Sequence, residues 1–377
     1  MGEPVGRAGV VGGGIGGLAT TIALRAAGWD VTVYERSPVF TEVGAGITLA
    51  ANALTALDVL GLGDTVRAAA IPDRPGFARN HRGRVLIDGQ VSDFVGGLVT
   101  LHRADLIEIL AAAVPEQCVR SGTRVTAVHA DGVIETDSGT ERFDLVVGAD
   151  GVHSVVREQL WPGESPVRRT GITAWRWVLD TPAPAPVGVI MGRYAEAGVI
   201  PMSGGRTYVF AAAHPGFATL DHFADWPDPL PQLIAATDPA RIVTDEILEI
   251  AVPQQLWKDR VVLVGDAAHA MRPTLGQGAG MALEDAVTLA ACAPDPARYS
   301  ATRRRRVATM SALSHHGTRM TSPGSATAAA LRDAIMLATP NALLIRMFRA
   351  ANRRALRGWQ PPQSITAPET HAADGSA

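Results

Sequence analysis

Three glycines near the start of the chain have the spacing of a loop that binds the phosphates of a dinucleotide. Gly12, Gly14 and Gly17 form the pattern G-x-G-x-x-G, between an apolar run and a stretch with helical periodicity. In such a loop the first glycine makes a tight turn, the second lets a pyrophosphate approach the backbone amides, and the third lets helix and strand pack. Ile15 and Gly16 belong to the same loop, so we include them among the predicted cofactor-binding residues.

An acidic residue ends the next predicted strand, as a dinucleotide-binding unit requires. Residues 30–35 read as a strand that closes with Glu35, and Arg36 follows directly. A carboxylate at this place accepts hydrogen bonds from the ribose of adenosine. Because an acidic residue lies where a side chain that binds the 2′-phosphate of NADP would be expected, the pattern favours FAD or NAD over NADP. We count Glu35 and Arg36 among the predicted cofactor-binding residues.

Two aspartates lie in later segments that also suit a cofactor site. Asp150 opens the segment DGVHSVVR, and Asp266 lies in the segment GDAAH, directly after the apolar run 261–264. A carboxylate at the carboxyl end of a strand lies where α/β sheets bind ligands, so Asp266 would accept a hydrogen bond from a cofactor hydroxyl. For either aspartate alone, a helix cap or a turn is the alternative role.

A glycine-rich loop follows Asp266 and leads into a predicted helix from about residue 278. The start of that helix would direct free amides and the positive end of its dipole at the cofactor. The predicted binding residues of this loop are Pro273, Gly276, Gln277, Gly278, Ala279 and Gly280.

Taken together, these motifs resemble those of the class A flavoprotein monooxygenases, the aromatic-hydroxylase family built on the para-hydroxybenzoate hydroxylase fold. The resemblance extends from Gly12 to about residue 291 and includes, in family order, the segments GAGITL at 44–49 and LHRADL at 101–106. It favours FAD over NAD as the bound dinucleotide. The chain has no second G-x-G-x-x-G in a strand-helix context, which agrees with a family that lacks a separate nicotinamide domain.

The resemblance also assigns roles to individual residues. It implies that Asp266 holds the ribityl chain and that Asp150 lies near the pyrophosphate and the nicotinamide route. It implies further that Arg103 lies along the flavin side chain and that the backbone of Val125 contacts the adenine.

The reaction that the resemblance implies is hydroxylation of a small aromatic or other electron-rich molecule. NADH or NADPH would reduce the flavin, O2 would add at its C4a position, and the hydroperoxide would transfer OH to the substrate. A flavoenzyme of the same fold that acts as epoxidase, oxidase or reductase is the alternative, and a non-enzymatic flavin-binding module is a third reading. The sequence identifies no catalytic base and predicts no metal site.

Composition excludes several other classes of protein. The 377 residues include 47% hydrophobic and 19% charged residues with a net charge of −3, which excludes overall disorder and a polycationic nucleic-acid binder. Two distant cysteines make no disulfide framework, so we expect a reducing cytoplasm. No uncharged apolar run approaches the roughly 18 residues of a membrane span, and no signal peptide is recognised. The protein would act as a monomer or a homodimer.

The chain is predicted to have an α/β fold with a discontinuous Rossmann-like FAD-binding domain, an inserted β-sheet substrate domain and C-terminal helices. The expected FAD-binding segments are 1–75, 98–170 and 255–330, and the expected substrate-binding segments are 76–97 and 171–254. A helical segment at 331–358 and a disordered tail at 359–377 would complete the chain.

The substrate is expected between the flavin and the inserted sheet, where Arg176, Glu196, Tyr208 and Phe210 are candidates to line the pocket with Pro273. Tyr208 and Phe210 are two apart on one predicted strand and therefore share a face. The stretch loosely resembles the urate-hydroxylase-like branch of the family. Glu196 stands where a basic residue would suit an anionic substrate, so we do not transfer that substrate.

Four further features are expected to be structural. Asn52 would cap a helix, His269 would brace its loop, and the arginine run 303–306 would lie on a solvated or partner-contacting helix face. Residues 331–357 mix apolar side chains with arginines; they would pack on the flavin domain, with a membrane-surface helix as the alternative.

Overall fold

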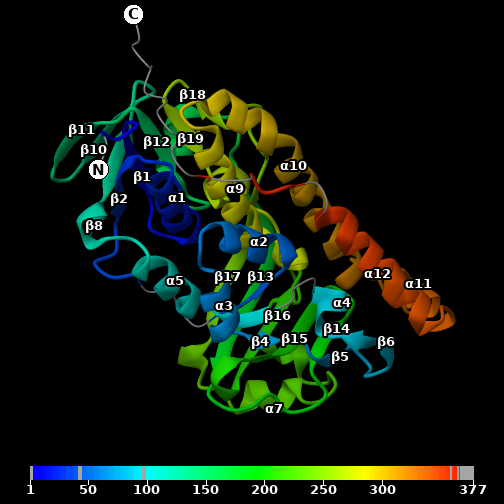
Figure 1. The fold of residues 1–377 in the computed structure, drawn as a ribbon. Helices are drawn as coiled ribbons and strands as arrows, with labels where there is room; N and C mark the ends of the chain where they lie inside the picture. The colour runs from blue at the N-terminus through cyan, green and yellow to red at the C-terminus, as the bar shows by residue number, and fades with distance from the viewer. Residues whose placement is uncertain (1–2, 41–44, 96–98, 357–358, 363–364, 366–377) are drawn as a thin grey trace, which may run out of the picture.

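The computed structural model describes residues 3–40, 45–95, 99–356, 359–362 and 365. Two large sheets, each with its own apolar core, account for most of this part of the chain, and a row of C-terminal helices runs along one side (Figure 1). The predicted α/β fold class with an inserted sheet and C-terminal helices is confirmed.

The first sheet has six strands in the order β18-β19-β12-β1-β2-β8. Its strands are β1 (Arg7–Val11), β2 (Asp30–Glu35), β8 (Val119–Ser121), β12 (Leu145–Gly148), β18 (Trp257–Lys258) and β19 (Val261–Leu263). All neighbours are parallel except β18 and β19. Because β1 lies between β2 and β12, the chain leaves β1 at the point where the strand order reverses, which is where such sheets bind ligands.

Helices cover this sheet and bury its apolar side chains. Helix α1 (Ile15–Ala26) connects β1 to β2 and packs beside α9 (Gly278–Cys292), as Figure 1 shows. The other helices up to residue 160 are α2 (Ala51–Val59), α3 (Gly63–Ala69), α4 (Val91–Val95), α5 (Arg103–Ala112) and α6 (Val155–Leu160), of which α4 contacts β5, β6 and β14 of the second large sheet. Short α8 (Asp266–His269) follows β19.

The second large sheet has seven strands in the order β17-β13-β16-β15-β14-β5-β6. Its strands are β5 (Pro75–Asn80), β6 (Val85–Gln90), β13 (Val167–Leu179), β14 (Gly188–Met191), β15 (Ala195–Met202), β16 (Arg206–Ala213) and β17 (Val243–Ile250). One face carries Trp175, Trp177 and Val209, which pack against Phe223 and the helix α7 (Leu230–Ala235). The side chains on the opposite face of this sheet therefore point away from this core.

The remaining strands form two three-stranded sheets. One contains β3 (Gly46–Leu49), β7 (Val99–His102) and β4 (Ile71–Pro72), and the other contains β9 (Val125–Val128), β10 (Val133–Thr136) and β11 (Gly139–Arg142). Single-turn helices lie at Glu116–Cys118, Ser203–Gly205, Leu220–Phe223, Pro239–Arg241 and Pro273–Leu275.

The C-terminal helices are α10 (Pro296–Thr321), α11 (Ala326–Ala338) and α12 (Asn341–Leu356). The expectation that residues after 331 pack on the flavin domain is wrong. Leu344, Ile345 and Phe348 of α12 pack instead on the β5–β6 edge of the seven-stranded sheet, together with Met336 of α11. Figure 1 shows α11 and α12 projecting away from the six-stranded sheet.

The expected disordered tail is also wrong for the part of it that the structure describes. Trp359 Nε1 donates a 3.0 Å hydrogen bond to Thr288 Oγ1 of α9, and Ile365 is buried in the core beneath the six-stranded sheet. Trp359 and Ile365 thus pack on the folded part of the chain, while residues 363–364 and 366–377 lie outside the described residues.

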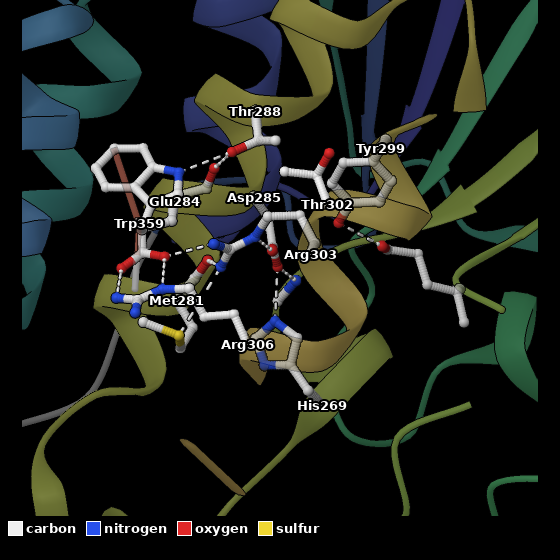
Figure 2. A network of polar contacts seen from close by, with 12 residues as sticks. His269, Met281, Glu284, Asp285, Thr288, Tyr299, Thr302, Arg303, Arg306 and Trp359 are labelled. Atoms are coloured by element: carbon white, nitrogen blue, oxygen red, sulfur yellow. Dashed lines mark hydrogen bonds and ion pairs between the residues drawn. The ribbon is translucent and has the colours of Figure 1, made fainter. Parts of the chain in front are cut away.

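A buried cluster of charged side chains joins α8, α9 and α10 (Figure 2). Glu284, Asp285 and Arg303 are completely buried, and Arg306 is 9% exposed. Arg303 forms ion pairs with both carboxylates, and Arg306 pairs with Glu284. The expectation of a solvated face is therefore wrong for Arg303 and Arg306, because two buried carboxylates require cations at the same depth. Arg305 is the one arginine of this run that is exposed, as expected of a solvated helix face.

We predict that Arg303→Met lowers the free energy of unfolding by about 3–5 kcal/mol, because two carboxylates lose a buried cation. Arg305→Met, two positions along the same helix, should change it by less than about 0.5 kcal/mol. Urea unfolding followed by circular dichroism measures both. Equal midpoints for the two variants would show that the cluster contributes no stability.

Candidate active site

The glycine loop after β1 forms an open cradle. A Cβ at Gly17 would lie 1.9 Å from the carbonyl oxygen of Gly12, and one at Gly12, whose φ is +103°, would lie 2.5 Å from that of Ala149. Both positions therefore admit only glycine. Around a Cβ built at Gly14, in contrast, no heavy atom lies within 4 Å. This space adjoins the first turn of α1, where Ile15 and Gly16 present amides without acceptors inside the helix.

Glu35 braces that loop. Its Oε2 accepts a hydrogen bond from the Gly13 amide at 2.7 Å, and its Oε1 accepts one from the Ser37 amide at 2.8 Å. The carboxylate thus connects the end of β2 to the loop after β1, as well as facing the cradle. Arg36 beside it is exposed.

Two further predicted residues lie at the starts of elements. Arg103 is the first residue of α5, and its amide donates to the Ala45 carbonyl at 2.9 Å, which joins α5 to the segment before β3. Residue 44 of the predicted GAGITL segment lies outside the described residues. Val125 is buried at the start of β9.

Asp150 follows β12, and its carboxyl group lies against the start of α6. Its Oδ2 accepts from the Val156 amide at 3.2 Å, whereas its buried Oδ1 has no partner within the protein. Burial raises the pKa of this carboxyl group. The helix α6 is capped by Ser154, which accepts from the Arg157 amide at 2.9 Å. Asp150 is therefore not the cap, and its free oxygen suits a polar ligand.

Asp266 opens α8 at the carboxyl end of β19, and its side chain is exposed. Its Oδ1 lies 4.0 Å from where a Cβ of Gly278 would stand, so it faces the start of α9. Between them the loop makes a single turn at Pro273–Leu275, and Gly276 adopts a left-handed conformation with φ of +61°. The structure thus brings together the carboxylate and the helix start that the sequence places twelve residues apart.

Asn52 supports this loop from α2, so its expected role as a helix cap is wrong. It lies inside the helix and is buried, and its Nδ2 donates to Gln277 Oε1 at 3.1 Å and to Glu284 Oε1 at 2.7 Å. Gln277 directly precedes α9. Sequence reasoning missed this contact; an asparagine on the apolar side of an amphipathic helix is the signal that could have revealed it.

His269 has the bracing role that was expected of it. It is completely buried, and its Nε2 lies 2.6 Å from Asp285 Oδ2, which also accepts from the Gly265 amide at 2.9 Å. Asp285 therefore holds both ends of α8, the helix that carries Asp266, as Figure 2 shows for His269.

The four predicted substrate residues share one face of the seven-stranded sheet. Residues directly opposite in antiparallel strands point to the same side. Arg176 is paired with Phe210, Glu196 with Ala212, and Tyr208 with Ile200. This is the face away from the tryptophan core.

The same face contacts β3 of the neighbouring three-stranded sheet. A Cβ at Gly46 of β3 would lie 2.5 Å from Cγ of Tyr208, so this glycine makes room for the ring. The rings of Tyr208 and Phe210 have centroids 5.9 Å apart, and Phe210 covers Gly198. These residues form an aromatic wall next to β3.

The charges on this wall are balanced. Arg176 forms an ion pair with Asp245 of β17, and Arg206 pairs with Asp105 of α5 at 2.7 Å. Burial raises the pKa of Tyr208 to about 12 and also raises the pKa of Glu196. Both groups therefore hold their protons more firmly than in water.

In the part of the chain that the structure describes, no group of three or more histidine, cysteine or acidic side chains could hold a metal ion. No single helix in it is both long and apolar enough to cross a membrane.

Comparison with known proteins identifies the family. Residues 7–293 match the family described as FAD binding domain. The chain is 38% identical over 330 residues to the aurachin C monooxygenase/isomerase of Stigmatella aurantiaca, covering 79% of this chain and 85% of that one. It is 36% identical over 307 residues to a 2-heptyl-3-hydroxy-4(1H)-quinolone synthase of Pseudomonas aeruginosa, covering 74% and 79%.

Among solved structures, HpxO of Klebsiella pneumoniae complexed with FAD and uric acid superposes with a TM-score of 0.83 at 27% identity, covering 95% of this chain and 98% of that one. The family that the motifs predicted is confirmed. The chain belongs to the FAD binding domain family and is a class A flavoprotein monooxygenase, an FAD-dependent hydroxylase with NAD(P)H as its co-substrate.

Proposed function

We propose that this enzyme hydroxylates a neutral, electron-rich aromatic or heteroaromatic ring bound between FAD and the aromatic wall of the seven-stranded sheet. The main observation in support is the charge balance of that wall, where Arg176 and Arg206 are each paired with an aspartate. An anionic substrate would need a cation that is not already compensated, and Glu196 on the same face supplies none.

Two relatives support a heteroaromatic substrate. The name of the Pseudomonas aeruginosa enzyme describes a 4(1H)-quinolone with a hydroxyl group and a heptyl chain, and that enzyme is 36% identical to this chain. HpxO binds uric acid at a lower identity of 27%. A 2-alkyl-4(1H)-quinolone is neutral and fits the aromatic wall better than urate does, so it is our first candidate. An epoxidase, oxidase or reductase of the same fold is the alternative.

We propose that FAD lies along the cradle after β1 and reaches the loop before α9. The residues present fit it: Gly14 leaves space for a pyrophosphate, and Asp150 has a buried oxygen without a partner in the protein. The proposed binding residues are Gly12, Gly14, Ile15, Gly16, Gly17, Glu35, Arg36, Arg103, Val125, Asp150, Asp266, Pro273, Gly276, Gln277, Gly278, Ala279 and Gly280.

The protein's own part in the reaction is to position the substrate and exclude water. Bound FAD supplies the redox chemistry, taking electrons from NAD(P)H and activating O2. Tyr208 and Phe210 offer flat apolar surfaces that orient a ring and keep water away. The first turn of α9 directs amides and the positive end of its dipole to the loop, which favours negative charge on a reduced flavin.

We also propose that the segments 76–97 and 171–254 form the substrate domain and that the rest up to residue 330 forms the FAD domain. The pairing of β5 with β14 supports this division. Cys118 and Cys292 are buried and free, which favours a cytoplasmic location, where the enzyme would act as a monomer or a homodimer.

Asp266→Ala should weaken FAD binding about tenfold or more, because a hydrogen bond to a charged acceptor contributes about 1.5–3 kcal/mol. Asp225→Ala, at an exposed aspartate of the other sheet domain, is the matched control. Titration of the apoprotein with FAD, followed by flavin fluorescence, measures both. Unchanged affinity in Asp266→Ala would remove this residue from the proposed site.

A panel of ring compounds tests the substrate class. We expect 2-alkyl-4(1H)-quinolones to stimulate NAD(P)H oxidation with product formation, and urate and hydroxybenzoates to do so weakly. Tyr208→Ala should lower the ratio of product to NAD(P)H consumed at least about threefold, whereas Tyr208→Phe keeps the ring and should preserve it. Stimulation by anions alone would contradict a neutral substrate.

Labelled oxygen distinguishes an enzyme that inserts oxygen, whether by hydroxylation or by epoxidation, from an oxidase or a reductase. With isotopically labelled O2, we expect one labelled oxygen atom in each molecule of product, measured by mass spectrometry. A product that lacks the label, together with stoichiometric peroxide, would favour an oxidase instead.

A further inference from the structure

Helix α11 directs its charged side chains toward the protein and exposes most of its apolar side chains; Ala329 and Met336 are its buried residues. Its only charged residues, Arg332 and Asp333, face the protein: Arg332 Nη1 donates to the carbonyl oxygens of Met320 at 3.0 Å and Gly192 at 3.2 Å, and Asp333 accepts from Asn80 Nδ2 at 2.8 Å. The outward positions, apart from Thr327, are Ala326, Ala328, Ala330, Leu331, Ala334, Ile335, Leu337 and Ala338. A helix on the surface of a protein in water normally has the opposite arrangement.

The exposed apolar surface continues along α10 and α12. Of the ten large apolar side chains that are exposed in the described chain, seven lie between residues 313 and 347. They are Leu313, Met320, Leu331, Ile335, Leu337, Leu343 and Met347, with Leu331 60% exposed and Ile335 56% exposed. Scattered exposed leucines are ordinary, but a cluster of this kind marks an interaction surface.

Arginines border the apolar stripe of α12. Arg346 and Arg353 lie three and ten positions after Leu343, so they share the exposed helix face of Leu343 and Met347. We define residues 326–356 as the C-terminal arm; it contains five arginines and one aspartate, although the whole chain has a net charge of −3. The aspartate, Asp333, is compensated by Arg332. The arm is therefore cationic as well as apolar.

The charge of the arm distinguishes between two possible binding partners, a second copy of this chain and a lipid surface. In a symmetric dimer the same surface patch meets itself, so the arginine-bordered face of α12 would meet its own like charges. An anionic lipid surface offers the opposite charge to Arg346 and Arg353 and a hydrocarbon boundary to Leu331 and Ile335. Charge complementarity thus favours a lipid surface.

The geometry of the arm suits the plane of a membrane surface. Helix α11 has 13 residues and α12 has 16, and the two are bent by 113° at their junction. Both are shorter than the roughly 20 apolar residues of a spanning helix, and α12 contains four arginines. In Figure 1 the arm projects from the body, so lipid can reach it without passing the two sheets.

We infer that the C-terminal arm docks the enzyme on an anionic lipid surface, with the apolar face of α11 in the headgroup region and the exposed Arg346 and Arg353 of α12 against lipid phosphates, whereas Arg349 is paired with Asp93. This inference rests on the surface of the arm and is independent of the proposed substrate.

Flotation of the FAD-loaded full chain with vesicles tests the inference. One set of vesicles contains equal parts of phosphatidylcholine and phosphatidylglycerol, and the other contains phosphatidylcholine alone. We expect the protein to float with the first set and to float much less with the second. Raising the salt concentration should weaken the binding, because the arginine contribution is screened.

Two double variants separate the apolar and the electrostatic parts. The double variant Arg346→Gln, Arg353→Gln should lower the partition coefficient about thirtyfold. Each arginine near an anionic surface raises that coefficient about fivefold. Leu331→Gln with Ile335→Gln should lower it at least about tenfold. Matched controls are Arg25→Gln with Arg305→Gln and the single variant Val5→Gln, all at exposed positions outside the arm. Controls should bind like the parent chain.

Three results would overturn the inference. The first is a parent chain that fails to float with the anionic vesicles. The second is binding that the arm variants leave unchanged while their FAD content and melting temperature match those of the parent. The third is a dimer, detected by light scattering, that Leu331→Gln with Ile335→Gln converts to a monomer, which would identify the face as a contact between two copies. None of these results depends on the substrate of the enzyme.

Discussion

The buried charge cluster around Arg303 is the constraint on which the cofactor side of the molecule depends. Glu284 and Asp285 are adjacent in α9, so their side chains leave the helix in different directions. Asp285 holds the Gly265 amide and His269, while Glu284 holds Asn52 and through it Gln277. Two loops that we propose as part of the FAD site are therefore fixed by neighbouring residues of one helix, and α10 supplies the compensating charge.

The local motifs were predictable because each one is decided within a few residues of chain. The turn at Gly12, the carboxylate at the end of β2 and the start of α9 all follow from spacing and residue type. The cluster was not predictable in this way. An arginine run such as 303–306 indicates a solvated helix face unless one knows that a helix about twenty residues earlier buries two carboxylates against it. Asn52 was missed for the same reason.

The substrate side was predictable only in part. Period-two alternation placed Tyr208 and Phe210 on one face of a strand, but the neighbours of that strand depend on pairing over long distances. The joining of β5 to β14 across more than a hundred residues, and the aspartates that compensate Arg176 and Arg206, have no local signature. These contacts determine the charge of the pocket, which is why the substrate is harder to infer than the cofactor.

The strand order of the six-stranded sheet also determines when the protein can acquire its cofactor during synthesis. β1 is made first, yet β19, which pairs with β12 beside it, begins only at residue 261. At about 5–20 residues per second, the ribosome needs roughly 12–50 seconds to pass from one to the other. β12 ends at residue 148, so its edge stays unpaired for the roughly 6–23 seconds that the ribosome needs to reach β19, and an unpaired edge is a site where nascent chains aggregate. Arg303 emerges later still, so the loops proposed to hold FAD can reach their folded arrangement only late in synthesis.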